Sequence, residues 1–375
     1  MLRMSRAASA SRAQVWFDGL GDWSWPGQAL RTPEVLPPPW VPAYPPATGG
    51  YAAGQRDALG RRAPAARALP AVLLAGAAAL GATLALHGQV SLARLVGARS
   101  ASAGALSAHG RPAALAQRFS LQPLPVLTPV SRDAAGSAIE HASFPSVSVH
   151  GRGGFLVYLP PGYSPARRYP VLYLLHGNEQ LAVEFLAQGD LQGELDRLIA
   201  AGRVPPMIAV MPEGGHGAIN WRNLGPQRWE SYVVEVQELI DRMLPTIRER
   251  DARAIAGDSM GAYGAMNVTL ANPYRFGVVE SWLGFFDGLQ AQLRSDEPVI
   301  RKLGLTAFVY GAAQDHIASP EEDAPFAAAL RAAGADAASA IYPGEHNMLT
   351  VHEHLAAQLL LIGRVFSEAE HRRHA

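Results

Sequence analysis

The serine of the pentapeptide Gly257-Asp258-Ser259-Met260-Gly261 has surroundings that indicate chemistry. The pentapeptide follows a short apolar run, residues 252–256, and opens a stretch of small residues, 262–270, with helical spacing. A strand, a sharp turn and a helix are thereby predicted, the context in which G-x-S-x-G exposes a nucleophile on a strained turn. Glycines suit the flanking positions because a Cβ there would collide with the strand or the helix. Ser259 is therefore predicted to be a nucleophile.

A serine nucleophile needs a base, and the base needs a group that orients it. Residues 306–310 (TAFVY) read as a buried strand that ends shortly before Asp315, and residues 337–342 form a later strand that ends shortly before His346. Loops that follow parallel strands meet at one edge of a sheet, so the two side chains are expected there together. We expect His346 to take the proton of Ser259 and Asp315 to hold the imidazole tautomer.

Each of these two assignments has an alternative. His346 could be an incidental loop residue, because the chain has 12 histidines. Asp315 could be a turn former or a helix cap. Asp287 and Glu345 are the rival acids, although Glu345 is very close in sequence to the histidine that it would have to orient. His316 is interpreted as a loop residue rather than a second base.

A second loop is a candidate for stabilising negative charge. Residues 171–175 (VLYLL) form a continuous apolar run, which predicts a central strand buried on both faces, and His176-Gly177-Asn178 follows it. One backbone N–H of this loop and the N–H of Met260 would form an oxyanion hole. We expect Asn178 to be the first donor, with Gly177 as the alternative, and His176 to orient the loop.

Aromatic side chains near the predicted catalytic edge are candidates for a substrate pocket. Trp282 and Phe285 end a predicted strand near that edge, and Trp221 ends the glycine-rich loop 212–222. Packing in the core is the alternative for all three, since pockets and cores both use aromatic residues. Glu280 places a carboxyl group inside a predicted strand. Such a group must be paired or protonated, or must point into the cleft; we expect Glu280 to be paired in the interior, with a substrate-facing position as the alternative.

Several segments, in addition to the pentapeptide, resemble the putative-esterase family of α/β-hydrolases. This family includes S-formylglutathione hydrolases (esterase D), feruloyl esterases, enterochelin esterases and mycobacterial mycolyltransferases. The resemblance covers most of residues 144–366, in the family order. The matching segments are 155–163 (FLVYLPPGY), 169–177 (YPVLYLLHG), 207–215 (MIAVMPEGG), 229–232 (WESY), 256–264 (AGDSMGAYG) and 344–346 (GEH).

The resemblance implies cleavage of a carboxylic ester, or transfer of its acyl group, through an acyl-enzyme. It assigns Ser259 as nucleophile, His346 as base and Asp315 as acid, and it implies a small-molecule or lipid ester as substrate, with no metal and no organic cofactor. The chain departs from the family pattern at Met348, where the family usually has Trp, and at Ala262, where a second Gly is common. The alternative function is a non-catalytic cell-envelope binding protein on a hydrolase scaffold. A peptidase is a weaker, third alternative.

Residue patterning predicts an α/β-hydrolase fold, with a mainly parallel central sheet and helices on both faces. From residue 171 onward, predicted strands mostly alternate with helices, whereas the first two strands have no helix between them and should form an antiparallel edge. The predicted strands are residues 147–149, 155–159, 171–175, 207–211, 252–256, 278–283, 306–310 and 337–342. The predicted helices are residues 181–201, 229–250, 259–271, 324–333 and 348–366.

The N-terminal part differs in composition from the rest of the chain. Residues 1–68 are rich in Pro, Ala, Gly and Arg and are predicted to be disordered. Residues 69–87 are predicted to form a transmembrane or signal-anchor helix, with a buried Ala-rich helix as the alternative. Residues 88–140 are assigned to a linker and residues 141–368 to the esterase domain. Arginines are denser before the apolar segment, so the esterase domain is expected outside the cytoplasm, membrane-anchored or secreted.

The charge and cysteine content point away from two classes of function. The formal net charge is +0, from 32 basic and 32 acidic residues, and no Lys/Arg stripe with interleaved aromatics occurs. Nothing in the sequence therefore indicates a nucleic-acid partner. The chain has 0 cysteines, so it has neither disulfides nor a cysteine-based zinc site.

Overall fold

The computed structural model describes residues 122–214 and 219–374. The predicted disordered segment 1–68, the predicted membrane helix 69–87 and the first part of the predicted linker lie outside these residues. Among the helices of the described residues, none combines the length and the apolar character that a bilayer span needs. The membrane anchor therefore stays a prediction from the sequence.

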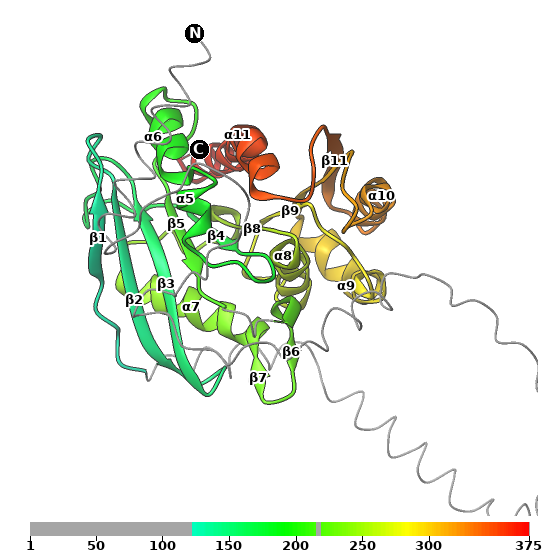
Figure 1. Ribbon diagram of the computed structural model, residues 1–375, viewed down its shortest axis with the longest axis horizontal. Coiled ribbons are helices and arrows are strands. Elements are labelled where there is room, and N and C mark those ends of the chain that lie inside the picture. Colours follow the sequence, from blue (N-terminus) through cyan, green and yellow to red (C-terminus); the bar gives the residue numbers. More distant parts are fainter. Residues whose placement is uncertain (1–121, 215–218, 375) are drawn as a thin grey trace, which may run out of the picture. The chain divides into compact units, whose positions relative to one another are not determined.

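A nine-stranded sheet is the centre of the fold, in the order β1-β2-β3-β5-β4-β8-β9-β10-β11 (Figure 1). The strands from β5 to β11 in this order pair in parallel, and β1, β2 and β3 form an antiparallel edge. The predicted α/β architecture with a mainly parallel sheet is confirmed. The strands are β1 (Thr128–Arg132), β2 (Ala138–Ser146), β3 (Gly151–Leu159), β4 (Val171–Leu175), β5 (Ile208–Pro212), β8 (Arg253–Asp258), β9 (Val278–Trp282), β10 (Thr306–Ala312) and β11 (Asp336–Tyr342).

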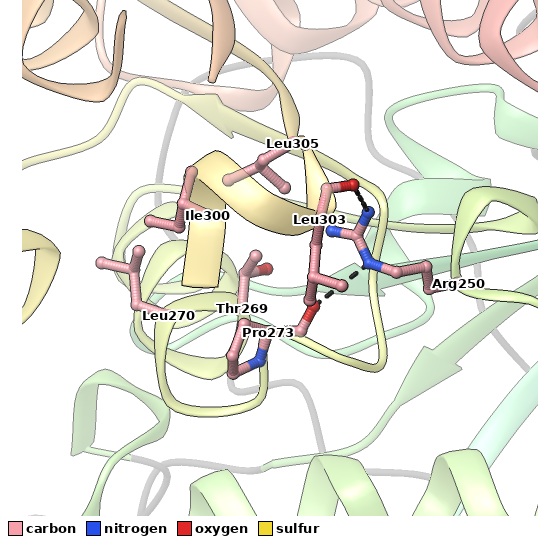
Figure 2. A pocket seen from close by; sticks show the side chains of 8 residues that line it. Arg250, Thr269, Leu270, Pro273, Ile300, Leu303 and Leu305 are labelled. Carbon is pink, nitrogen blue, oxygen red and sulfur yellow. Dashed lines mark hydrogen bonds between the residues drawn. The ribbon is translucent and has the colours of Figure 1, made fainter. Parts of the chain in front are cut away.

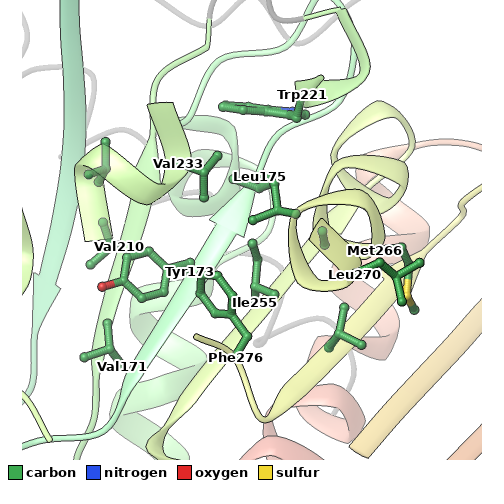
Figure 3. Close-up of a cluster of buried hydrophobic side chains, with 14 of the residues drawn as sticks. Val171, Tyr173, Leu175, Val210, Trp221, Val233, Ile255, Met266, Leu270 and Phe276 are labelled. Carbon is green, nitrogen blue, oxygen red and sulfur yellow. The ribbon is translucent and has the colours of Figure 1, made fainter. Parts of the chain in front are cut away.

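Both faces of the sheet are covered, because alternate residues of the central strands enter two separate apolar clusters. Val171, Tyr173 and Leu175 of β4 belong to one cluster, part of which Figure 3 shows, and Leu172 and Leu174 belong to the other. The first cluster contains residues of α7 (Trp229–Met243), α8 (Met260–Ala271), α9 (Leu289–Leu303) and α10 (Asp323–Ala332), and the second contains residues of α5 (Glu184–Ala187), α6 (Leu191–Ala200) and α11 (Met348–His374).

The prediction of a strand at residues 147–149 is wrong. These residues lie in the turn that joins β2 to β3, two strands that pair from Ala138–Leu159 to Ser146–Gly151. The carboxylate of Glu235, on α7, accepts hydrogen bonds from the N–H groups of Val147 (3.0 Å) and Ser148 (3.2 Å). A short apolar run could not reveal this turn, because its backbone donors are bonded by a side chain 87 and 88 residues away.

The boundary between the predicted linker and the predicted domain also differs from the structure. β1 and the first residues of β2 fall before residue 141, and both strands pair with the central sheet. Ser137 immediately precedes β2, and its Oγ donates a hydrogen bond to Asp196 on α6 (2.7 Å). The folded unit therefore begins before residue 141, in sequence that is too weakly patterned to predict a strand.

Two predicted helices are shorter in the structure, for identifiable backbone reasons. Residues 181–201 form α5 and α6 rather than one helix, because Asp190, between them, has a φ of 54°, outside the right-handed helical region. A Cβ on the preceding Gly189 would lie 2.6 Å from the carbonyl oxygen of Phe185, so glycine suits this turn. The helix that begins at Trp229 ends at Met243 instead of 250. Leu244 is extended because the residue before a proline avoids the helical region.

Two further helices differ from the sequence prediction. α9 (Leu289–Leu303) was not predicted, because its sequence is largely polar and Pro298 lies within it. α11 extends to His374, beyond the predicted end at residue 366. Neither difference moves a candidate site residue, since both changes lie outside the loops that follow β4, β8, β10 and β11.

Candidate active site

Ser259 lies at the junction of β8 and α8, in a backbone conformation that side chains rarely adopt. Its φ is 53° and its ψ is −117°, outside the regions favoured by residues that carry a Cβ. Its N–H is held by the carbonyl oxygen of Trp282 on β9, at 2.9 Å. Strain of this kind persists only where the surrounding structure enforces it, and it is typical of functional sites.

The two glycines of the pentapeptide are explained by the approach of β4. A Cβ on Gly257 would lie 2.4 Å from the carbonyl oxygen of Leu175, and a Cβ on Gly261 would lie 1.8 Å from the same atom. Real Cβ atoms do not approach backbone oxygens so closely, so only glycine fits either position. Glycine is therefore required at both positions because the serine turn packs closely against the end of β4.

Three side chains from separate loops form a continuous chain of contacts. The Oγ of Ser259 lies 2.7 Å from Nε2 of His346, and Nδ1 of the same imidazole lies 2.7 Å from Oδ2 of Asp315. The second carboxylate oxygen, Oδ1, accepts hydrogen bonds from the N–H groups of Ile317 (2.8 Å) and Ala318 (2.9 Å). Because a carboxylate only accepts, Nδ1 carries the imidazole proton, and Nε2 is free to accept from the serine hydroxyl.

The rival residues do not reach this arrangement. Asp287 and Glu345 are exposed, as is His316, which the sequence analysis interpreted as a loop residue. Within the described residues, Asp315 is the carboxylate in an ion pair or hydrogen bond with His346. The side chain of Asp315 is 1% exposed and that of His346 is 12% exposed, so the contact between them is shielded from water.

The loop after β4 distinguishes the two candidate oxyanion donors. The N–H of Gly177 donates to Oε1 of Gln180, at 2.6 Å. In the part of the chain that the structure describes, no acceptor is bonded to the N–H of Asn178 or to that of Met260. The geometry therefore leaves Asn178, rather than Gly177, as the available partner of Met260.

The structure buries two of the three aromatic residues that the sequence analysis proposed for a substrate pocket. Trp221 and Trp282 are 0% exposed, so neither indole presents a surface to solvent. The Nε1–H of Trp221 donates to the carbonyl oxygen of His176 (3.1 Å), and that of Trp282 donates to Glu280 (2.8 Å). Phe285 is partly exposed and stacks on Tyr263, with 5.1 Å between ring centroids. Both tryptophans are thus core residues in this structure, and Phe285 keeps accessible surface.

Glu280 occupies an interior position without an ion pair. It is 0% exposed; its Oε2 accepts the indole hydrogen of Trp282, and its Oε1 has no partner among the described residues. Burial raises the pKa of Glu280 to about 8, although the hydrogen bond from Trp282 acts in the opposite direction. The carboxyl group is therefore mostly protonated at neutral pH, and among the described residues it has a hydrogen bond from Trp282 in place of the buried ion pair that the sequence analysis expected.

The buried Glu280 predicts a stability that depends on pH. An unfolded glutamate ionises near 4.5, whereas the folded pKa is about 8, so between these values folding takes up a proton. Stability is then lost as pH rises, by up to about 1.4 kcal/mol per pH unit in this window. Glu280→Gln removes the titration and keeps an acceptor for Trp282. We expect this variant to be more stable than the wild type at pH 8, with a smaller difference at pH 5.

Denaturant unfolding at pH 5 and pH 8 measures this effect. Glu297→Gln is the matched control, because the Glu297 side chain is 46% exposed and pairs with Arg301 on the surface of α9. If the free energy of unfolding changed with pH in the same way in the wild type and in Glu280→Gln, Glu280 would not titrate as described.

Asp258 and Gln180 are neighbours of the serine that the sequence analysis did not single out. Asp258 is 3% exposed, and burial raises the pKa of Asp258 to about 6, opposed by a side-chain hydrogen bond from Gln180 and by the charges of His176 and His346. A charged residue inside the pentapeptide, at the end of a buried strand, was the available signal for Asp258. No comparable sequence signal existed for Gln180.

An apolar hollow elsewhere in the fold is unrelated to Ser259. Leu270, Ile300 and Leu305 line it at the C-terminal end of α8 (Figure 2). Ser259 precedes the other end of this helix, about 18 Å away for 12 residues. Arg250 also lines the hollow and donates hydrogen bonds to the carbonyl oxygens of Pro273 and Leu303, both at 3.1 Å. These hydrogen bonds link the segment after α8 to the C-terminal end of α9, and none of the three proposed triad residues lines the hollow.

The fold and the arrangement around Ser259 define a protein of the α/β-hydrolase class. A family model described as "Putative esterase" matches residues 146–347, more than half of the 375-residue chain. The chain therefore belongs to this esterase family, as the resemblance in the sequence indicated.

Curated relatives match part of the chain. Esterase Rv1288 of Mycobacterium tuberculosis (strain ATCC 25618 / H37Rv) is 33% identical over 149 residues, 36% of this chain and 30% of that protein. An endo-1,4-beta-xylanase/feruloyl esterase of Xylanibacter ruminicola is 35% identical over 133 residues, 32% of this chain and 18% of that protein. The matches thus span less than a third of the length of these relatives.

Solved structures share the fold at lower sequence identity. A ferulic acid esterase superposes with a TM-score of 0.57 and 23% identity, covering 61% of this chain and 99% of that one. An S-formylglutathione hydrolase (FrmB) from Staphylococcus aureus superposes with a TM-score of 0.52 and 16% identity, covering 60% and 98%. Nearly the whole of each solved chain therefore corresponds to about three fifths of this one.

Proposed function

We propose that this chain cleaves carboxylic esters with a Ser259–His346–Asp315 triad, through an acyl-enzyme on Ser259. The observation that carries the proposal is the pair of 2.7 Å contacts that join the hydroxyl, the imidazole and the carboxylate in the order needed for proton transfer. Membership of the esterase family supports the reaction class.

Acylation follows from the proton positions at the site. As Oγ of Ser259 attacks the ester carbonyl carbon, its proton moves to Nε2 of His346. Asp315 accepts the Nδ1–H and stabilises the imidazolium that forms. The N–H groups of Met260 and Asn178 are the proposed donors to the oxyanion of the tetrahedral intermediate. Collapse of the intermediate breaks the ester C–O bond, and Nε2–H protonates the leaving alcohol.

Deacylation uses the same groups in reverse. His346 removes a proton from an attacking water, which adds to the acyl carbon, and the proton returns to Oγ of Ser259 as the acid is released. A second alcohol can replace water at this step without any change in proton path. The site therefore supports hydrolysis and acyl transfer by one mechanism, and hydrolysis is the reaction that we propose for a small-molecule or lipid ester.

Covalent labelling with a fluorophosphonate tests this proposal. The reagent phosphonylates a serine whose proton is removed by a neighbouring base, so we expect one phosphonate per chain, on the peptide that contains Ser259. Intact-mass and peptide mass spectrometry measure the stoichiometry and the position. Heat-denatured protein is the control and should remain unlabelled, because unfolding separates Ser259 from His346. Labelling of another residue, or none, would contradict the assignment of the nucleophile.

A further inference from the structure

The loop that follows β4 has one peptide unit bonded at both ends. The carbonyl oxygen of His176 accepts the Nε1–H of Trp221, at 3.1 Å, and the N–H of Gly177, in the same peptide unit, donates to Oε1 of Gln180, at 2.6 Å. A peptide unit is planar, so hydrogen bonds at both its C=O and its N–H fix its rotation. Two side chains therefore set the orientation of this peptide.

The next peptide unit is held at one end, which determines the direction of the other. The carbonyl oxygen of Gly177 lies 2.8 Å from Nδ1 of His176. Nδ1 must carry the proton, because a carbonyl only accepts. On its other side, Nε2 of His176 accepts from the N–H of Gly214 (3.0 Å) and lies 3.3 Å from Oε1 of Glu213. In a trans peptide, C=O and N–H point in opposite directions, so the N–H of Asn178 points away from His176.

Gln180 also connects this loop to the strand that carries the serine. Its side chain lies against the carboxylate of Asp258, the residue immediately before Ser259, and opposes the rise that burial causes in the pKa of Asp258. The packing here is close: a Cβ on Gly177 would lie 2.7 Å from Oε1 of Gln180 and 3.0 Å from Oδ2 of Asp258. The amide of Gln180 thus lies between the loop that follows β4 and the end of β8.

We infer that Gln180 is a positioning residue of the oxyanion hole: it accepts the N–H of Gly177 and packs the loop against Asp258, so that the N–H of Asn178 is the donor presented beside that of Met260. This inference rests on the proposed function. Donors that are fixed before the reaction stabilise a developing oxyanion without reorganisation. A side chain that orients the loop therefore affects the rate, although it does not touch the substrate. Trp221 orients the same loop by donating a hydrogen bond to the carbonyl oxygen of His176, at the other end of the peptide unit that contains the N–H of Gly177.

Gln180→Met tests the inference, because methionine keeps the volume of the side chain and removes both the hydrogen bond from the N–H of Gly177 and the polar amide beside Asp258. Loss of one oxyanion donor costs about 10²- to 10³-fold in kcat, so a displaced donor is expected to cost about 10- to 100-fold. KM for a p-nitrophenyl ester should stay about the same, since the donor acts mainly in the transition state. Gln188→Met, at an exposed glutamine that ends α5, is the matched control.

Unchanged kcat in Gln180→Met, or a rise in KM alone, would overturn the inference. If Gln180→Met does not fold, a second pair of variants decides. Trp221→Phe removes the indole hydrogen that His176 accepts, whereas Trp229→Phe removes one that has no partner among the described residues. We expect kcat to fall in the first variant and to change less in the second; equal values would overturn the inference.

The proposed function and this inference fail in different ways. Absence of phosphonate on Ser259 in the wild type would remove the proposed function itself. A wild type that is labelled at Ser259, with a fully active Gln180→Met, would remove the positioning role of Gln180 and leave the triad in place.

Discussion

Replacement of Ser259 by alanine is expected to lower kcat/KM for a p-nitrophenyl ester by about 10⁴-fold or more. Alanine lacks the oxygen that attacks the ester, so no acyl-enzyme can form, and the residual rate comes from substrate binding and the oxyanion donors alone. The fold should persist, because the substitution removes one oxygen and leaves the contact between His346 and Asp315 intact. Initial rates of p-nitrophenol release measure the loss.

The matched control for this variant is Ser367→Ala, whose hydroxyl bonds the carbonyl oxygen of Gly363 within α11. It should retain wild-type activity, and its purification alongside Ser259→Ala reports any contaminating esterase. Equal rates for Ser259→Ala and the wild type would exclude the serine mechanism and favour a binding protein on a hydrolase scaffold.

Asp315→Asn is expected to lower kcat by about 10³- to 10⁴-fold at pH 7. Asparagine has nearly the shape of aspartate, and its oxygen can keep the hydrogen bonds from Ile317 and Ala318. Its NH₂ group would then face Nδ1 of His346 and donate to it, so the imidazole proton would move to Nε2. A protonated Nε2 cannot accept the proton of Ser259, so the nucleophile would lose its base.

Steady-state kinetics of Asp315→Asn and Asp287→Asn compare the two candidate acids directly. Asp287 is exposed, and its contact with the site is a hydrogen bond from Tyr263 to its backbone carbonyl, which asparagine keeps. We expect Asp287→Asn to retain wild-type activity. Near-normal activity of Asp315→Asn, with a large loss in Asp287→Asn, would transfer the role of acid to Asp287.

The sequence was informative where local pattern and backbone geometry coincide. The glycines around Ser259 appear in the sequence because a Cβ at Gly257 or Gly261 would meet the carbonyl oxygen of Leu175. The buried strands of the parallel sheet appear as apolar runs because both of their faces are covered. Asp315 and His346 were identified as candidates because loops after parallel strands converge at one edge of the sheet.

Other features depended on contacts that have no local signature. The turn at residues 147–150 is stabilised by Glu235, and β1 acquires its strand conformation by pairing with β2. An indole in the core and an indole in a pocket look alike in a sequence, so the burial of Trp221 and Trp282 could not be predicted.

By itself, the sequence determined the class of fold, the serine turn and the three residues that could form a triad, since each depends on residue type and on position relative to a strand. The tertiary structure decided which acid reaches His346, which of Gly177 and Asn178 has an available N–H, and what Gln180 contacts. These outcomes depend on differences of a few tenths of an ångström in the distances between side chains, and on which hydrogen-bonding groups already have partners. Residue type and spacing do not encode such distances.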